Sequence, residues 1–266
     1  MTATLGAIHV YPLKSGAPLS PASAEVGARG LRGDRRWMLV DEQGRFVTGR
    51  QVPQLVLLRA TPLPEGLKLE YPDAPPLELG YPGPSAPRIE AHVWNDAVSA
   101  PLAEAADAWL GRHVGRGLRL VHMDDEARRA VRADYASPGD IVSFADAFPL
   151  LLIGAGSLAG LNARLQQPVA MARFRPNLVV EGSAAHAEDE WQRIRIGAVE
   201  LDVVKPCTRC VFTTVEHETG RFDPDGEPLA TLKQYRRTPA GVTFGQNLIP
   251  RAFGTIRVGD AVEQLL

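Results

Sequence analysis

Residues 203–216 read VVKPCTRCVFTTVE and contain the only two cysteines of the 266-residue chain, Cys207 and Cys210. A structural zinc site takes about four ligands, and one CxxC pair supplies two of them. The six histidines show no close pairing that would complete such a site. A thioredoxin-like couple places its CxxC motif at the start of a helix, whereas the β-branched run at 211–216 predicts a strand.

The residues beside the two thiols favour a further interpretation. Lys205 and Arg209 are cationic, and cationic neighbours favour the thiolate, which is the form that binds metals. Four interpretations remain open at this point: two half-buried cysteines that act as small apolar residues, a redox pair, half of a zinc site, or one metal ligand beside a bystander.

The composition sets limits on the class of protein. A chain of 266 residues with 45% hydrophobic residues can bury a substantial core, in one large domain or two modest ones. The net charge is -2, from 29 basic and 31 acidic residues, so no global field attracts nucleic acid or a membrane surface. We therefore expect neither nucleic acid nor membrane as a partner, and any anion site must be local.

The N-terminal sequence MTATLGAIHVYPLKSG lacks the basic and apolar regions of an export signal. No apolar run approaches the roughly 20 residues of a membrane span. We expect a soluble, cytoplasmic protein whose thiols are reduced.

Short apolar runs between turn residues dominate the chain, a pattern typical of strands. Residues 36–51 predict a hairpin with Gly44 at its turn, residues 103–113 predict a helix, and the charged stretch 123–140 predicts a linker or surface loop. A short helix is expected at 157–165, with Ser157 as its N-cap. The remaining expected strands are 7–13, 55–60, 66–71, 88–94, 118–123, 174–182, 193–204, 211–216, 244–250 and 254–265. Such a chain is expected to close its strands into a barrel with helical inserts.

Several motifs, in order along the chain, resemble one family. CTRCVFTTVE at 207–216, FRPNLVV at 174–180 and FGQNL at 244–248, followed by GTIRVGDAV, resemble a MOSC domain. Upstream, YPLKS at 11–15 and the stretch 30–55 resemble the N-terminal β-barrel module that precedes MOSC in the amidoxime-reducing components and their bacterial relatives. The resemblance implies a β-rich α+β fold, with a β-barrel-like module over 1–122 and a MOSC β-barrel with helical inserts over 123–266.

The resemblance also implies a molybdenum cofactor (Mo-molybdopterin), with the metal held by the pterin dithiolene and one protein cysteinate. In the family the second cysteine of the CxRC motif is the ligand, which is Cys210 here, and Cys207 is then the bystander. A soft thiolate suits a metal already bound through sulfur, and a cofactor with its own ligands removes the need for four from the protein. The positions that match the family's cofactor contacts are Lys14, Ser15, Arg35, Arg175, Asn177, Thr208 and Arg209.

Asp146 in SFADAFPLLLIG precedes an apolar run. Burial there is expected to raise its pKa and to let it shuttle protons. In the resemblance this residue lies beside the metal, so it is the second expected catalytic residue after Cys210.

The implied activity is reduction of an N–O bond in small N-hydroxylated compounds, giving an amine or amidine plus water. Because the chain shows no GxGxxG motif and no further cysteines for an iron–sulfur domain, we expect electrons from a separate donor protein, ferredoxin-like or cytochrome b5-like, with a reductase. We also expect the chain to lack the mitochondrial anchor of the eukaryotic proteins. Two other functions remain open. A molybdenum-cofactor or sulfur carrier would hold persulfide on Cys210, and a CxxC thiol redox protein would form a reversible Cys207–Cys210 disulfide.

Overall fold

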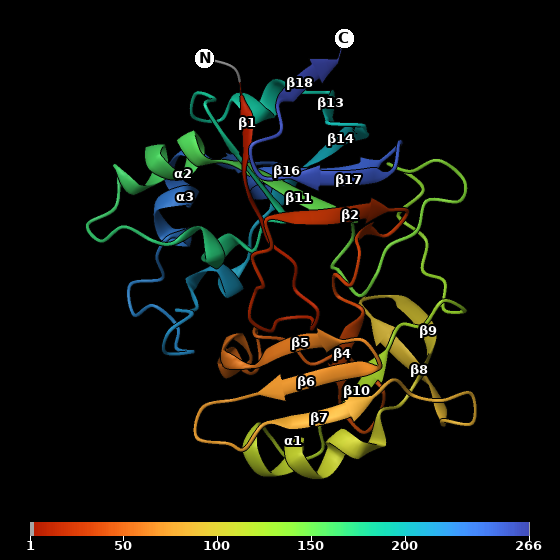
Figure 1. Ribbon diagram of the computed structural model, residues 1–266. Coiled ribbons are helices and arrows are strands. Elements are labelled where there is room, and N and C mark those ends of the chain that lie inside the picture. Colours follow the sequence, from red (N-terminus) through yellow and green to blue (C-terminus); the bar gives the residue numbers. More distant parts are fainter. Residues whose placement is uncertain (1–2, 266) are drawn as a thin grey trace.

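The computed structural model describes residues 3–265, which form an upper barrel and a lower β-rich module (Figure 1). The barrel is an eight-stranded sheet in which seven strands follow the order β1-β12-β11-β16-β14-β13-β18 and β15 pairs with β16. The strands are β1 (Thr4–Ile8), β11 (Leu150–Gly154), β12 (Leu178–Glu181), β13 (Arg193–Ile196), β14 (Val199–Thr208), β15 (Arg237–Thr238), β16 (Gly241–Pro250) and β18 (Val262–Leu265).

The two ends of this sheet meet, which nearly closes the barrel. The amide of Leu5 in β1 donates to the carbonyl of Asp260 at 2.8 Å, and the amide of Val262 in β18 donates to the carbonyl of Ala3 at 2.8 Å. Leu5 and Ile8 join a buried apolar cluster with residues of β11 to β18. The first strand of the chain is therefore part of the barrel formed by its second half.

A small sheet joins the start of the chain to its end as well. It pairs β17 (Gly254–Arg257) with β2 (Ser23–Gly27), which pairs with β3 (Gly30–Leu31).

The lower module contains β4 (Trp37–Val40), which pairs with β10 (Arg119–His122). All four residues of β4 are buried: Trp37 and Leu39 join one apolar cluster, and Met38 and Val40 join another. A strand covered on both faces reads as an unbroken apolar run, which explains the sequence WMLV. The other elements here are β5 (Arg59–Leu63), β6 (Gly66–Glu70), β7 (Leu77–Gly80), β8 (Arg88–Val93), β9 (Asp96–Pro101), α1 (Asp107–His113) and the 3-10 helices η1 (Pro53–Leu57) and η2 (Glu104–Ala106).

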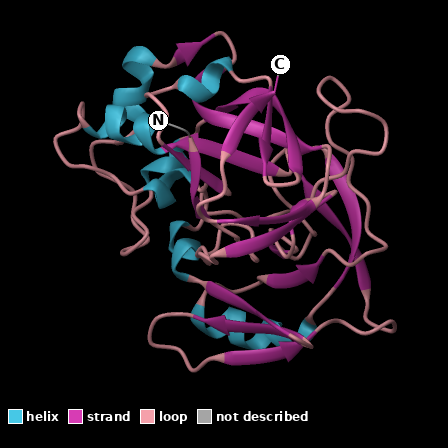
Figure 2. Ribbon diagram, turned by 45° about the horizontal axis from the view of Figure 1, so that its top comes forward, coloured by secondary structure: helices cyan, strands magenta, loops and turns pink. Residues whose placement is uncertain are grey.

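Helices are few, and those of the upper half gather on one side of the barrel (Figure 2). They are α2 (Ala155–Asn162), α3 (Leu229–Tyr235), η3 (Met171–Phe174), η4 (Ala187–Glu190) and η5 (Val211–Thr214). The expected fold class is confirmed: the protein is β-rich, with barrels and helical inserts. The predicted boundary between residues 122 and 123 stays a prediction.

Several local predictions are wrong, and the strand expected at 7–13 ends at Ile8. Residues 211–214 form the 3-10 helix η5 instead of a strand. The N-cap of α2 is Gly154, and Ser157 lies inside the helix, where its buried hydroxyl donates to Glu188 Oε1 at 2.7 Å. Residues 55–60, expected as one strand, divide between η1 and β5.

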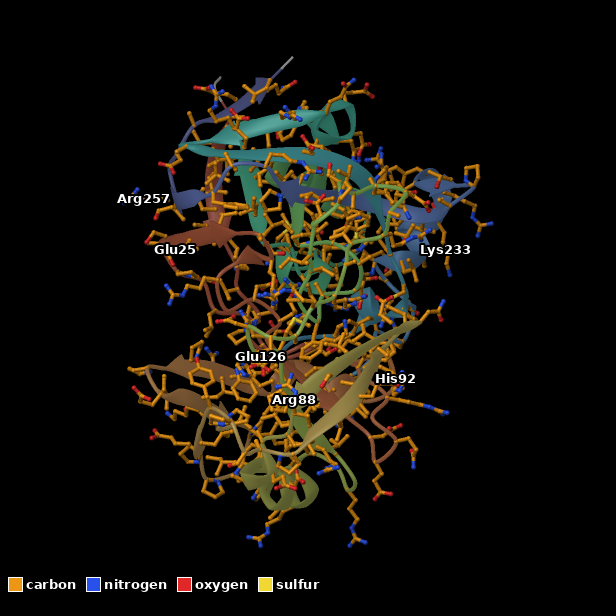
Figure 3. All side chains as sticks on the ribbon, turned by 90° about the vertical axis from the view of Figure 1, so that its right-hand side faces the viewer. Glu25, Arg88, His92, Glu126, Lys233 and Arg257 are labelled. Carbon is orange, nitrogen blue, oxygen red and sulfur yellow. The ribbon has the colours of Figure 1, made fainter. Side chains whose placement is uncertain are left out.

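The stretch 123–140 holds no helix or strand but is anchored in the protein. Arg88 forms ion pairs with Asp124 and Glu126. Arg88 and Glu126 are labelled in Figure 3. Arg129 of the same stretch is 5% exposed. The prediction of a simple surface loop is therefore wrong for Arg129.

Candidate functional site

A cavity of about 1000 Å³ is lined by residues from both halves of the chain. All nine residues predicted for the site line it: Lys14, Ser15, Arg35, Asp146, Arg175, Asn177, Thr208, Arg209 and Cys210. Its charged lining is strongly cationic, with nine basic residues against the two carboxylates of Asp96 and Asp146. The five basic residues that were not predicted are Arg50, Arg129, Arg132, Arg173 and Lys205.

Unusual backbone conformations place several of these side chains. Ser15, Arg35 and Arg175 have φ values of 66°, 46° and 57°, in the left-handed region that residues other than glycine rarely adopt. The amide of Arg35 donates to the carbonyl of Tyr11 at 2.7 Å, and the amide of Lys14 donates to that of Trp37 at 2.8 Å. Strained residues of this kind concentrate at functional sites, so their position on one cavity supports a functional role.

The side chain of Asn177 forms hydrogen bonds within the protein. Its Oδ1 accepts from Arg35 Nη1 at 3.0 Å and from the amide of Leu151 at 3.2 Å, and its Nδ2 donates to the carbonyl of His9 at 3.1 Å. Arg35 also forms a 2.6 Å ion pair with the buried carboxylate of Asp34. Asn177 therefore orients Arg35, and its predicted contact with a pterin stays a prediction.

Two guanidinium groups stack on one buried tyrosine. The central guanidinium carbons of Arg35 and Arg175 lie 4.3 Å and 4.2 Å from the ring centre of Tyr11, which is fully buried. Burial raises the pKa of Tyr11 to about 12, against the opposing effect of the arginines. Burial likewise lowers the pKa of Arg175 to about 10, so this arginine is still cationic at neutral pH.

Two buried N–H groups beside the cavity lack hydrogen-bond partners among residues 3–265. They are Arg175 Nη2 and Arg209 Nε. Another nitrogen of each side chain is held in place, because Arg175 Nη1 donates to the carbonyl of Gly16 and Arg209 Nη2 to that of Phe174, at 2.7 Å and 2.6 Å. A buried donor without a partner carries a desolvation cost, which an anionic group in the cavity would remove.

A chain of polar contacts runs from Lys14 to Cys210. Lys14 Nζ lies 2.5 Å from Asp146 Oδ1, Arg50 Nη2 lies 2.7 Å from Asp146 Oδ2, and Arg50 Nε lies 3.3 Å from Cys210 Sγ. Burial lowers the pKa of Lys14 to about 8, although Asp146 acts in the opposite direction.

The expected rise in the pKa of Asp146 is wrong. The surrounding protein by itself raises the pKa, but the charges of Lys14 and Arg50 outweigh that effect and hold it well below its usual range. The side chain is also 51% exposed. Asp146 is therefore a carboxylate at neutral pH rather than a neutral acid.

The two free cysteines contact different groups. Cys210, the N-cap of η5, lies beside Arg50. Cys207 Sγ lies 3.0 Å from Arg209 Nη1 and packs against the apolar cluster around Ile153. Within the described residues 3–265 no group of three or more His, Cys, Asp or Glu side chains could hold a metal ion. Both thiols line the cavity, and a thiol beside cationic walls fits an anionic metal cofactor that brings its own sulfur ligands.

Arg50 and Arg129 are the main site residues that sequence reasoning missed. Arg50 lies in the stretch 30–55 that carried the family resemblance, which was the available signal. Arg129 donates to Asp96 Oδ2 at 2.7 Å, to the carbonyl of Asp146 at 2.9 Å and to that of Ser143 at 3.0 Å. It thus fixes the segment that carries Asp146, and its charged, aperiodic surroundings gave no sign of this.

Known protein families and proteins are similar to this chain over most of its length. The MOSC N-terminal beta barrel domain matches residues 2–117, and the MOSC domain matches residues 139–263. Mitochondrial amidoxime-reducing component 1 of Mus musculus is 37% identical, covering 97% of this chain and 81% of the relative. The protein of the same name from Xenopus laevis is 34% identical, covering 95% and 79%. The YUAD protein from Bacillus subtilis, a solved structure, covers 99% of this chain and 95% of its own, with 12% identity and a TM-score of 0.43.

One expectation is overturned by these relatives. They are named mitochondrial components, so the expectation of a cytoplasmic protein is wrong. In the described part of the chain, no helix has the length and apolar composition needed to cross a membrane. With both domain models matched in order and relatives aligned over nearly its whole length, this chain belongs to the MOSC family and groups with the amidoxime-reducing components.

Proposed function

We propose that this protein is a molybdenum-dependent reductase of N-hydroxylated compounds. For an amidoxime, the reaction is R–C(NH2)=N–OH + 2 e⁻ + 2 H⁺ → R–C(NH2)=NH + H2O. The proposal draws on the family and on its relatives, which are named amidoxime-reducing components.

The observation that carries the proposal is the composition of one cavity. Two cysteine thiols, two buried guanidinium N–H groups without partners among residues 3–265, and a cationic lining occur together there. Charge-assisted hydrogen bonds to Arg and Lys are the strong way to hold a phosphate group. This arrangement suits a phosphate-bearing cofactor better than it suits a thiol redox couple, because the two sulfurs contact different arginines.

Specific roles follow for the residues of the cavity. The thiolate of Cys210 would be the protein ligand of molybdenum. The residues that would hold the pterin and its phosphate are Lys14, Ser15, Arg35, Arg175, Asn177, Thr208 and Arg209. When bound, the molybdenum cofactor supplies the two electrons that cleave the N–O bond.

Lys14 and Asp146 would deliver protons as a pair. Because Asp146 is ionised, Lys14 is the protonated member, and its Nζ can donate to Asp146 Oδ1 across 2.5 Å. Arg50 holds the other carboxylate oxygen at 2.7 Å, so the carboxylate keeps a fixed orientation toward the cavity.

Electrons would reach the cofactor from a separate donor protein, ferredoxin-like or cytochrome b5-like. The test combines molybdenum analysis with benzamidoxime turnover, on protein from a host that makes the cofactor. About one molybdenum per chain and reduction driven by a small reduced dye, but not by NADH alone, are the expected results. Absence of molybdenum, with persulfide on Cys210 or a Cys207–Cys210 disulfide, would contradict the proposal. Robust turnover with NADH alone would contradict the need for a donor.

A further inference from the structure

Trp94 occupies a backbone position that suits a smaller residue. It follows β8 in the β8–β9 hairpin, where Val93 pairs with Asp96 and leaves Trp94 and Asn95 as the two loop residues. Its φ is 56°, a conformation for which Gly, Asn or Asp is preferred in two-residue loops. A bulky residue in this region is an outlier, and such outliers are retained where the side chain has a function.

The indole of Trp94 is exposed but held in place. Its exposed fraction is 52%, and it lines the same cavity as Cys210. The ring of Phe46 lies edge-on at 5.1 Å between centroids, with an interplanar angle of 62°. The guanidinium of Arg50 lies 4.8 Å from the indole centroid, and Arg50 also binds Asp146 and Cys210. Trp94 therefore has a fixed position one contact away from the proposed metal ligand.

The charges near the indole favour a neutral ligand over a cation. The two carboxylates on the cavity wall are already paired, Asp96 with Arg129 at 2.7 Å and Asp146 with Lys14 and Arg50. Lys14, Arg50 and Arg129 would repel a protonated amine. An aromatic amidoxime is uncharged and flat, and flat rings stack on an indole in offset or edge-on geometry.

We propose that Trp94 forms a binding subsite for the planar aromatic part of N-hydroxylated substrates. The subsite rests on the proposed reductase function for its ligand, but it makes a separate claim about which substrates bind. It determines specificity through stacking and takes no part in the reaction.

The first test compares benzamidoxime with acetamidoxime, which has no ring. Trp94→Leu should raise the KM for benzamidoxime about three- to tenfold, the range expected for one aromatic pair, and change that for acetamidoxime less than twofold. Trp94→Phe should restore most of the loss. Tyr81→Leu is the matched control, because Tyr81 is 44% exposed and lies outside the cavity lining; it should change neither KM. An equal rise for both substrates in Trp94→Leu would overturn the subsite.

The second test measures binding without turnover. Benzamidoxime should quench the tryptophan fluorescence of the full chain, and Trp94→Leu should abolish most of that quenching. Quenching that survives the substitution would also overturn the subsite. If wild-type protein reduces neither compound but the quenching still depends on Trp94, the reductase proposal fails and the subsite stands.

Discussion

At the scale of single residues, the two cysteines differ in their surroundings. Cys210 lies next to Arg50, within the chain of contacts that reaches Lys14, whereas Cys207 packs against the apolar cluster around Ile153. We predict that Cys210→Ala loses molybdenum and dye-driven turnover, while Cys207→Ser keeps most of both, because one thiolate suffices as ligand. Molybdenum content per chain and benzamidoxime reduction are the measurements. Equal losses in the two variants would contradict this assignment.

Substitutions of Tyr11 can distinguish two roles of this residue: positioning two arginines, and contacting a ligand directly. Its hydroxyl has no hydrogen-bond partner among residues 3–265, while its ring faces Arg35 and Arg175. We predict that Tyr11→Phe keeps molybdenum occupancy and that Tyr11→Leu weakens cofactor retention about tenfold or more, because two desolvated cation–π contacts are lost.

The control for Tyr11 is Trp191→Leu, which removes a buried aromatic ring from the barrel core. This variant should lose stability in thermal melts but keep its affinity for inorganic phosphate in cofactor-free protein. Tyr11→Leu should lose that affinity. A loss of occupancy in Tyr11→Phe would mean that the hydroxyl contacts the ligand and that stacking is not the cause.

Asp146 is predicted to act through its charge. Asp146→Asn keeps the shape of the side chain but removes the partner of Lys14 and Arg50. The variant should retain molybdenum and slow dye-driven reduction on the order of 10²–10⁴-fold, the range typical of a lost acid–base group. Wild-type rates at equal molybdenum content would leave Asp146 with a structural role.

The effect of Asp146→Asn on folding stability should depend on pH. The pKa of Asp146 is lowered in the folded protein, so its ionised form contributes stability above the unfolded-state pKa of about 3.9, and this contribution is lost as the pH falls below that value. Wild-type protein should therefore be more stable than Asp146→Asn at pH 7, and the difference in urea midpoint should shrink below about pH 4. A difference that is constant with pH would contradict the ionic origin.

At the scale of elements, η5 shows how tertiary contacts outweigh β propensity. Thr213 and Thr214 donate their hydroxyls to the carbonyls of Cys210 and Val211 at 2.9 Å and 2.8 Å. The ring of Phe212 packs on Gly49 of the lower module so closely that a Cβ there would lie 2.0 Å from it. These contacts fix the turn that follows Cys210.

We therefore predict that Gly49→Ala displaces Phe212 and, with it, the segment that carries Cys210. Molybdenum occupancy should fall severalfold, since Phe212 also lies 5.5 Å from the guanidinium of Arg175. The matched control is Gly83→Ala, where an added Cβ meets nothing within 4 Å, and which should leave occupancy unchanged. Equal occupancy in the two variants would show that the Gly49 contact can relax without effect.

At the scale of the whole molecule, the chain passes from the upper barrel to the lower module and back. We refer to these two parts as the two lobes. β1 joins the barrel sheet and β2 and β3 join the small sheet with β17; the lower module follows, and the chain then returns to complete the barrel. The cavity is also lined from both lobes. We predict that the lobes unfold in a single transition. Single-tryptophan variants that retain Trp109 in the lower module or Trp191 in the barrel should give coincident melting curves. Two separate midpoints would show that the lobes are stable independently.

The barrel strands were predictable because their apolar residues recur in short runs between turn residues, as in 244–250 and 193–204. The nine candidate site residues were predicted through motifs of the family, since any one arginine among so many carries little information by itself. Tyr11 and Arg50 lie in stretches that carried the family resemblance, but their roles were missed, because a buried ring between two guanidiniums, or a bridge from a carboxylate to a thiol, leaves no local pattern.

The sequence by itself determined the β-rich class and the family, because those depend on local patterns and ordered motifs, and it named nine candidate residues that the structure brings to one cavity. Only the tertiary structure decided the ionised state of Asp146, the helical turn after Cys210 and the burial of Arg129. Each of these depends on contacts between segments far apart in the chain: Asp146 with Lys14 and Arg50, Phe212 with Gly49, and Arg129 with Asp96. The energies of charge pairing and close packing depend on such distances, and spacing along the sequence does not contain them.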